Sequence, residues 1–172
     1  MTTERTIIDF GDKDEVGLWG KVNDTVMGGL SKGQISASDD IAVFEGRVSL
    51  ENFGGFASIR SHPRFLDLTG YDGLIVRVRG DGKRYRLRLR MDEDFEGPAY
   101  QATFFTAAGE WTESHLSFEE FVPVFRGYVI EGAPPLDPGA IRRVGFMIAD
   151  RQQGPFRLEI QEIRVYRNDG EK

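Results

Sequence analysis

Hydrophobic and polar residues alternate with a period of two along most of the chain, which is typical of β-strands with one buried face. Turn-forming residues interrupt this alternation roughly every 8–12 positions, and almost no segment has the spacing of an amphipathic helix. The alternation predicts eight strands: Ile41–Leu50, Phe56–Arg60, Leu74–Arg79, Tyr85–Met91, Tyr100–Phe105, Trp111–Leu116, Val144–Ala149 and Phe156–Tyr166.

These short strands predict an all-β fold, a jelly-roll β-sandwich that forms a single domain over residues 1–172, with a closed barrel as the alternative. The segment from Gly80 to Lys83 predicts a hairpin turn between two strands, because glycine tolerates the positive φ that such turns need. One short helix is expected from Ser117 to Phe121, since Ser117 and Glu120 have the spacing of a capping box.

The segment from Arg84 to Met91 has the clearest two-sided pattern. Its inward residues are predicted to be Tyr85, Leu87, Leu89 and Met91, and its outward residues Arg84, Arg86, Arg88 and Arg90. The preceding strand repeats the pattern with Arg77 and Arg79 outward, so we expect six arginines on one sheet face. Gln101 and Thr103 of the following strand alternate in a way that places them on the same face.

Two interpretations of this face are open. The arginines could pair with acidic residues of neighbouring strands and do no more than solvate the sheet. They could instead form a recognition surface for an anionic or polyhydroxyl ligand, or for a complementary protein surface, because the planar guanidinium group binds such partners well.

Composition narrows the classes of function. The 28 acidic and 22 basic residues give a net charge of −6, which argues against a nucleic-acid partner, and 17 of the basic residues are arginine. Without cysteine there is no disulfide, thiolate or zinc-ribbon chemistry, and two histidines offer little for catalysis. We expect no membrane insertion, since no run of about 18 apolar residues exists. The N-terminal residues have acids and lack the apolar core of a signal peptide, which predicts a cytoplasmic protein.

The least ordinary segment runs from Trp19 to Gly33. It holds a cluster of polar and small residues that we take as candidates for binding: Asn23, Asp24, Met27, Gly28, Gly29 and Ser31. Adjacent glycines can expose backbone N–H groups, and Asn and Asp readily cap their own turns. The segment is therefore either an ordered turn or a loop that binds a ligand or partner, and its order of residues is not that of a phosphate-binding loop.

Other candidates are weaker. Trp111 and Phe156 are interpreted as core aromatics, with stacking platforms for a sugar or base as the alternative. The acidic run from Asp92 to Asp94 has oxygen ligands for a hard cation but does not match a calcium-binding loop, so no metal site is predicted. No nucleophile motif, nucleotide fingerprint or distinctive carboxylate pair is present, and we expect neither catalysis nor a cofactor.

Several segments together resemble the complex I intermediate-associated protein 30 family. The longest are Val22-Asn-Asp-Thr-Val-Met-Gly-Gly29, Phe44-x-Gly-x-Val-Ser-Leu-Glu-Asn52 and Gly54-Gly-Phe-Ala-Ser-Ile-Arg60. Shorter ones follow at Val78-Arg-Gly-Asp-Gly82, Tyr100-Gln-Ala-x-Phe104, Phe118-x-x-Phe121-x-Pro123-x-Phe-Arg-Gly127 and Gln153-Gly-Pro-Phe-x-Leu-Glu-Ile160. The resemblance therefore covers essentially the whole chain.

The resemblance implies a galactose-binding-domain-like jelly roll and a non-catalytic assembly factor whose protein partners are assembly intermediates of respiratory complex I. We favour this function over its alternative, a module that binds carbohydrate or another small polar ligand. The predicted binding residues outside the Trp19–Gly33 segment are Arg60, Arg86, Arg88, Gln101 and Arg126.

Overall fold

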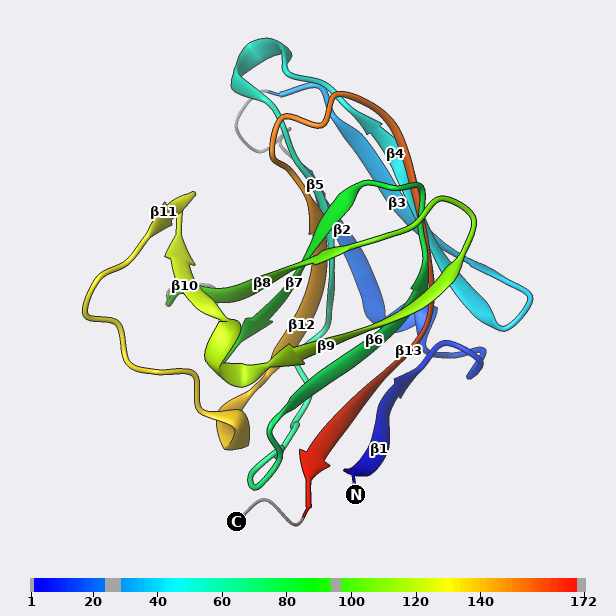
Figure 1. Ribbon diagram of the computed structural model, residues 1–172. Coiled ribbons are helices and arrows are strands. Elements are labelled where there is room, and N and C mark those ends of the chain that lie inside the picture. The colour runs from blue at the N-terminus through cyan, green and yellow to red at the C-terminus, as the bar shows by residue number, and fades with distance from the viewer. Residues whose placement is uncertain (1, 24–28, 94–96, 170–172) are drawn as a thin grey trace.

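Two antiparallel β-sheets face each other in the computed structural model, which describes residues 2–23, 29–93 and 97–169, the side chain of Phe53 excepted (Figure 1). The strands are β1 (Thr2–Asp9), β2 (Trp19–Asn23), β3 (Lys32–Ser38), β4 (Ile41–Val48), β5 (Ala57–Ser61), β6 (Gly73–Arg79), β7 (Arg84–Arg90), β8 (Ala99–Phe105), β9 (Trp111–Ser117), β10 (Val122–Phe125), β11 (Tyr128–Val129), β12 (Arg143–Ile148) and β13 (Gly154–Asn168). The predicted all-β sandwich is confirmed, and two separate sheets exclude the closed barrel.

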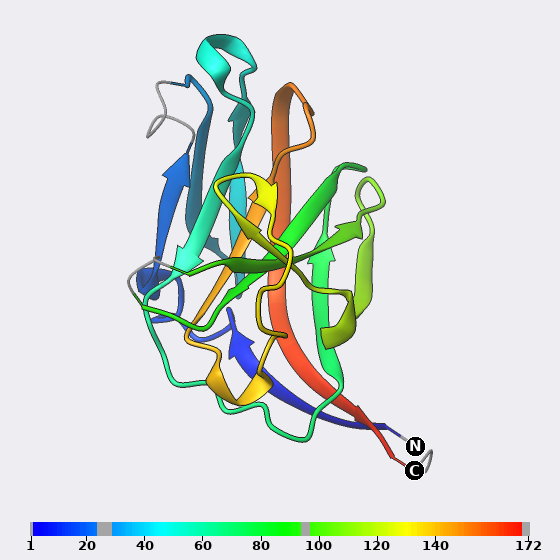
Figure 2. The same cartoon turned by 90° about the vertical axis from the view of Figure 1, so that its left-hand side faces the viewer.

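The first sheet has the order β3-β4-β13-β6-β9, and the long strand β13 is at its centre. The first half of β13 pairs with β4 on one side, its second half pairs with β1 on the same side, and β6 lies along the other side. The second sheet has the order β11-β10-β8-β7-β12-β5-β2. In Figure 2, strands β7 and β8 of this second sheet cross in front of β13.

The core lies between the two sheets and is rich in aromatic rings. Phe44 of the first sheet packs edge-on against Phe156, with ring centres 4.9 Å apart. It packs in the same way against Tyr85 of the second sheet, with ring centres 6.5 Å apart. Tyr85, Leu87 and Leu89 are fully buried, as the alternation predicts, because every second residue of β7 faces the opposite sheet.

The hairpin predicted at Gly80–Lys83 is wrong, because β6 and β7 belong to different sheets. The segment instead carries the chain from one sheet to the other. Asp81 holds it in place: its carboxylate accepts hydrogen bonds from the hydroxyl of Tyr85 at 3.0 Å and from the backbone N–H of Arg157 at 2.8 Å. Alternation shows which side of a strand is buried but not which strand lies beside it, so consecutive strands were wrongly taken as neighbours.

Five strands were not predicted: β1, β2, β3, β10 and β11. Four of them lie at the margins of the sheets, where much of each strand is exposed on both faces and the alternation is weak.

The predicted helix is present as a single 3₁₀ turn, η4 (Phe118–Glu120). Ser117 Oγ accepts from the backbone N–H of Glu119 at 3.3 Å, and the Glu120 carboxylate accepts from the N–H of Ser117 at 2.7 Å, which confirms the capping box. Further 3₁₀ turns, which the alternation did not predict, are η1 (Val16–Leu18), η3 (Glu51–Phe53) and η5 (Pro138–Ala140). Within the described ranges, no helix has the length and apolar character needed to cross a membrane.

Candidate functional site

A groove of about 610 Å³ lies on the outer face of the second sheet. Strands β5, β7, β8 and β12 form its floor, and the β10–β11 hairpin projects beside it, at the left of Figure 1. Seven arginines line it: Arg60, Arg86, Arg88, Arg90, Arg126, Arg143 and Arg151. Among the described residues that line it, Asp150 is the one acid. We call this feature the arginine groove.

Strand register places one row of residues across the middle of the groove. Gly145 of β12 lies opposite Arg60 of β5 on one side and opposite Arg88 of β7 on the other. Gln101 of β8 lies opposite Arg88 in turn. Because neighbouring strands are about 4.8 Å apart, Arg60 and Arg88 rise roughly 10 Å apart with no side chain between them. Gly145 therefore contributes no side chain to the floor of the groove between them.

The β10–β11 hairpin brings Arg126 to the groove. Its two-residue turn, Arg126-Gly127, has positive φ at both positions, 50° and 84°, as expected for the type I′ turn that best fits twisted strands. The guanidinium carbon of Arg126 lies 5.2 Å from the ring centre of Phe125, which also lines the groove. The apolar residues Tyr128 and Val129 beyond the turn are largely exposed.

The arginines of the groove differ in how their charges are matched. Arg86 forms an ion pair with Asp150. Arg90 donates to the carbonyl oxygen of Gly97 at 3.0 Å and lies 3.8 Å from Asp92. Arg88, in contrast, has no ion pair with any described residue, and its buried Nε has no hydrogen-bond partner there.

Burial and like charge lower the proton affinity of these groups. Burial first, and then the charges of Arg90, Arg86 and Arg60, together lower the pKa of Arg88 to about 10. The pKa of Arg60 is also lowered to about 10, first by burial and then by Arg143 and Arg90. No described residue of the groove therefore neutralises the positive charge of Arg88.

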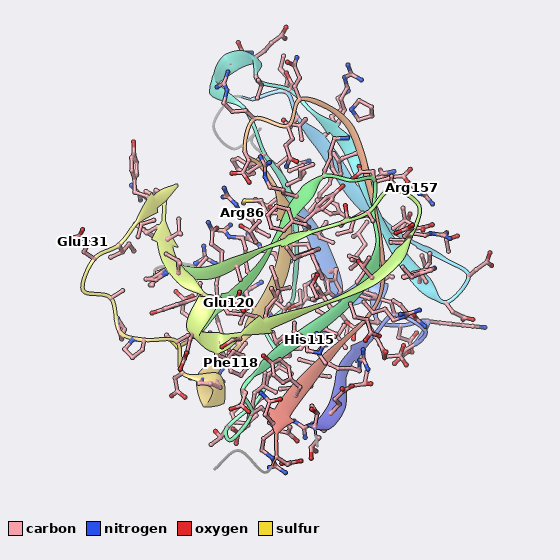
Figure 3. The ribbon with its side chains drawn as sticks, viewed as in Figure 1. Arg86, His115, Phe118, Glu120, Glu131 and Arg157 are labelled. Atoms are coloured by element: carbon pink, nitrogen blue, oxygen red, sulfur yellow. The ribbon has the colours of Figure 1, made fainter. Side chains whose placement is uncertain are left out.

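The outer face of the first sheet differs, because its half-buried arginines are paired with acids, while the exposed Arg47 of β4 has no ion pair with a described residue. These pairs are Arg77–Glu113, Arg79–Glu159, Arg157–Glu45 and Arg164 with Glu4 and Glu113. A hydrogen bond from Arg79 lowers the pKa of the Glu159 carboxyl, as expected for a matched pair. Figure 3 shows Arg157 and Arg86 on opposite sides of the molecule.

The prediction of six arginines on one face is therefore wrong. Arg77 and Arg79 extend from β6 over the first sheet, whereas Arg86, Arg88 and Arg90 extend from β7 over the second. For Arg77 and Arg79 the interpretation as a solvated, ion-paired face is confirmed. Gln101 and Thr103 do share a face with the β7 arginines, since they lie opposite Arg88 and Arg86.

Of the binding candidates in the Trp19–Gly33 segment that the structure describes, none lines the arginine groove, although Val22 of the same segment does. Asn23 and Ser31 border a separate hollow beside β3 and β4, where Asn23 Nδ2 donates to the carbonyl oxygen of Gly33 at 3.3 Å. Ser31 is fully buried: its hydroxyl donates to Ser49 O and accepts from Ser49 N at 3.1 and 2.8 Å, a structural role. Gly29 is also buried, while the predicted residues Asp24, Met27 and Gly28 lie outside the described residues.

The two candidate stacking aromatics and the acidic run can also be compared with the structure. Phe156 is a core residue as predicted, but Trp111 is not: it lies half-exposed on the edge strand β9, between the guanidinium groups of Arg77 and Arg79 at 5.4 and 5.3 Å. In the described part of the chain, no group of three or more His, Asp or Glu side chains is placed to hold a metal ion, and Asp94 of the acidic run lies outside that part.

Residues of the groove that the sequence analysis missed include Arg143, Gly145, Asp150 and Arg151. The alternation of Arg143, Gly145 and Met147 with buried Val144, Phe146 and Ile148 would have revealed the first two. Nothing in the sequence pairs β12 with β7, so only the structure places them beside Arg88.

The fold is that of the β-sandwich carbohydrate-binding modules. A family 11 carbohydrate-binding module from Clostridium thermocellum, solved in complex with a mixed-linked tetrasaccharide, superposes with a TM-score of 0.71 over 94% of both chains at 14% identity. Part of an agarase matches with a TM-score of 0.66 over 97% of this chain and 25% of its own, at 12% identity. At such identities the likeness concerns the fold alone.

The chain belongs to the complex I intermediate-associated protein 30 family, which matches residues 8–160. The mouse mitochondrial protein of that name is 29% identical over 96% of this chain and 57% of its own length. The Drosophila melanogaster mitochondrial protein is 28% identical over 91% and 61%. The chain thus spans between half and about three fifths of the length of the curated relatives that it matches.

The prediction of a cytoplasmic protein is contradicted by these comparisons, since relatives from mouse, Drosophila melanogaster and Neurospora crassa are all named as mitochondrial proteins. That prediction was based on the absence of cysteine and on the N-terminal residues. Neither observation determines the compartment of a chain.

The unmatched charge of Arg88 predicts a gain in stability when it is removed. Arg88→Met keeps the apolar stem and removes a half-buried cation that faces other arginines, so the free energy of unfolding should rise by about 1 kcal/mol. A chain of this size should then melt roughly 2–4 °C higher, measured by circular dichroism. Arg47→Met, an exposed site on β4, is the control and should change little.

The gain should also depend on pH. The pKa of Arg88 is lowered in the folded state, so the unfolded chain binds its proton more strongly and the wild type gains stability as pH rises through about 10. The advantage of Arg88→Met over wild type should therefore be full at neutral pH and shrink above that value. A variant less stable than wild type at neutral pH would contradict the interpretation of Arg88 as an unmatched charge.

Proposed function

We propose that this chain is a non-catalytic protein that associates with assembly intermediates of respiratory complex I and binds a protein partner there through the arginine groove. Family membership supports the first part, because the matched relatives carry names that describe association with complex I intermediates. The chain spans only part of the length of those relatives, so their role as whole proteins is proposed for this chain.

The second part is carried by one observation, the contrast between the two outer faces. The half-buried arginines Arg77, Arg79 and Arg164 of the first sheet are matched by acids, whereas the half-buried Arg88 in the middle of the second sheet is not. Burying an unmatched cation lowers stability, so a groove that retains Arg88 is better explained by a partner that supplies the missing negative charge.

The alternative, a carbohydrate-binding module, is supported by the fold likeness alone. Its expected stacking platform, Trp111, is on the outer face of the first sheet between two guanidinium groups, and not in the groove. The aromatic side chains that line the groove itself are Phe56 and Phe125, both partly buried.

The test is affinity capture from cells that contain complex I, followed by mass spectrometry of the recovered proteins. The wild-type chain should recover complex I subunits, and Arg88→Glu should recover them at least about tenfold less, because it places a like charge against an acidic partner. The matched control is Arg47→Glu, which reverses an exposed charge on the first sheet and should leave recovery unchanged.

Two outcomes would count against the proposal. If the wild-type chain recovers no complex I subunit, the association itself is wrong. If Arg88→Glu and wild type recover the same amount, the association stands but the arginine groove is not the surface that makes it.

A further inference from the structure

The arginines of β7 are spaced so that they can be met by an extended chain. Arg86 and Arg88 lie on the same side of one strand, two residues apart, and therefore about 6.8 Å apart along its axis. An extended peptide has the same repeat, so its alternate side chains would meet successive guanidinium groups. Along an α-helix, residues four apart on one face are about 6.0 Å apart, which follows the strand repeat less closely.

Gly145 lies in the middle of the arginine groove, between Arg60 and Arg88. Gly145 is itself buried, and no larger side chain would be accommodated there: a Cβ on Gly145 would lie 2.8 Å from the carbonyl oxygen of Ile59 and 3.4 Å from the Cβ of Arg60. Gln101, opposite Arg88 on the other side, supplies an amide that can donate a hydrogen bond.

A carboxylate fits this position best. Its two oxygens match the planar fork of a guanidinium group, and such charge-assisted pairs are stronger than neutral hydrogen bonds. The groove also has an apolar side, since Val124 and Phe125 of β10 line it and Tyr128 and Val129 extend the hairpin into solvent. A cationic floor beside an apolar wall suits a protein segment with both acidic and apolar side chains.

We propose that the arginine groove binds an extended acidic segment of a partner protein, with acidic side chains at alternate positions and one carboxylate seated over Gly145 against Arg88 and Gln101. This inference rests on the proposed function and specifies the chemistry of the partner. It needs Arg86 to exchange its intramolecular acid, Asp150, for an acid of the partner, and it gives Arg88 a carboxylate.

The test is fluorescence anisotropy with the full chain and a labelled peptide of about ten residues in which Ser and Glu alternate. The peptide should bind, and its Gln counterpart should bind at least about tenfold more weakly, because the carboxylates are gone. A peptide of the same composition with its Glu residues in one block should bind about threefold or more weakly than the alternating one, since only alternate residues share one side of an extended chain.

The variants test the position. Arg88→Met should weaken binding of the alternating peptide at least about tenfold while its melting temperature shows that it folds, and Arg47→Met should bind like wild type. Arg88→Lys keeps the charge but loses the planar fork, so it should lie between wild type and Arg88→Met.

Four results would overturn the inference: equal binding of the Glu and Gln peptides, equal binding of the alternating and blocked peptides, undiminished binding by Arg88→Met, or tighter binding of an oligogalacturonate of the same charge. They are distinguishable from failure of the proposed function. If complex I subunits are still recovered by wild type and lost with Arg88→Glu, that function stands and only the acidic segment is wrong.

Discussion

Replacing Glu15 with Ala should lower the free energy of unfolding by about 3–5 kcal/mol, because it breaks a buried charge network. The Glu15 side chain is only 9% exposed. Its carboxylate accepts hydrogen bonds from both terminal nitrogens of Arg64, at 3.1 and 2.6 Å. It also accepts one from the indole N–H of Trp19, at 2.9 Å. Without Glu15, a cation and an indole N–H are left buried with their partner gone.

The loss would spread because Trp19 belongs to the core. Its ring lies 5.4 Å from that of Phe10 and 6.0 Å from that of Phe146, whose strand also forms the floor of the arginine groove. The ion pair to Arg64 ties the N-terminal segment to the loop after β5. We therefore expect the change to loosen the packing beneath the groove as well as the N-terminal turn.

Urea unfolding followed by tryptophan fluorescence measures the effect. Glu110→Ala, at an exposed position, is the control and should change stability by less than about 0.5 kcal/mol. Glu15→Ala combined with Arg64→Met should recover part of the loss, since the stranded cation is removed. A loss below about 1 kcal/mol for Glu15→Ala alone would show that water replaces the carboxylate and that the network is not critical.

Replacing Gly46 with Ala should lower the free energy of unfolding by about 3–4 kcal/mol. Gly46 of β4 lies opposite Gly33 of β3, and a Cβ there would come within 1.8 Å of the carbonyl oxygen of Lys32. Because the clash is with backbone, a change of rotamer cannot relieve it, and β3 must move away from β4. The edge of the first sheet should then separate.

Hydrogen exchange locates this effect. The amides of β3 should lose protection in Gly46→Ala, while those of β7 and β12, in the other sheet, should keep most of theirs. Gly20→Ala on β2 is a matched control: a Cβ there meets nothing within 4 Å, so we expect a change of less than about 0.5 kcal/mol. Unchanged protection of β3 in Gly46→Ala would contradict the expected steric conflict.

The candidate site shows how far local pattern extends. Alternation placed Arg86 and Arg88 on an outer face and Gln101 beside them, because each depends only on the period of a strand and on a short connection. Alternation could not show that Asp150 pairs with Arg86 while Arg88 has no acidic partner, since Asp150 lies 64 residues along the chain. The two interpretations of the arginines therefore stayed open until the strands were ordered.

By itself the sequence determined that this is an all-β protein of the complex I intermediate-associated protein 30 family and which side of each main strand is buried, because alternation and motifs are local properties of the chain. Only the tertiary structure decided that β6 and β7 lie in different sheets and that Gly145 lies between Arg60 and Arg88. The reason is physical: side-chain period sets the face of a strand, but its neighbours depend on packing between residues far apart in the chain.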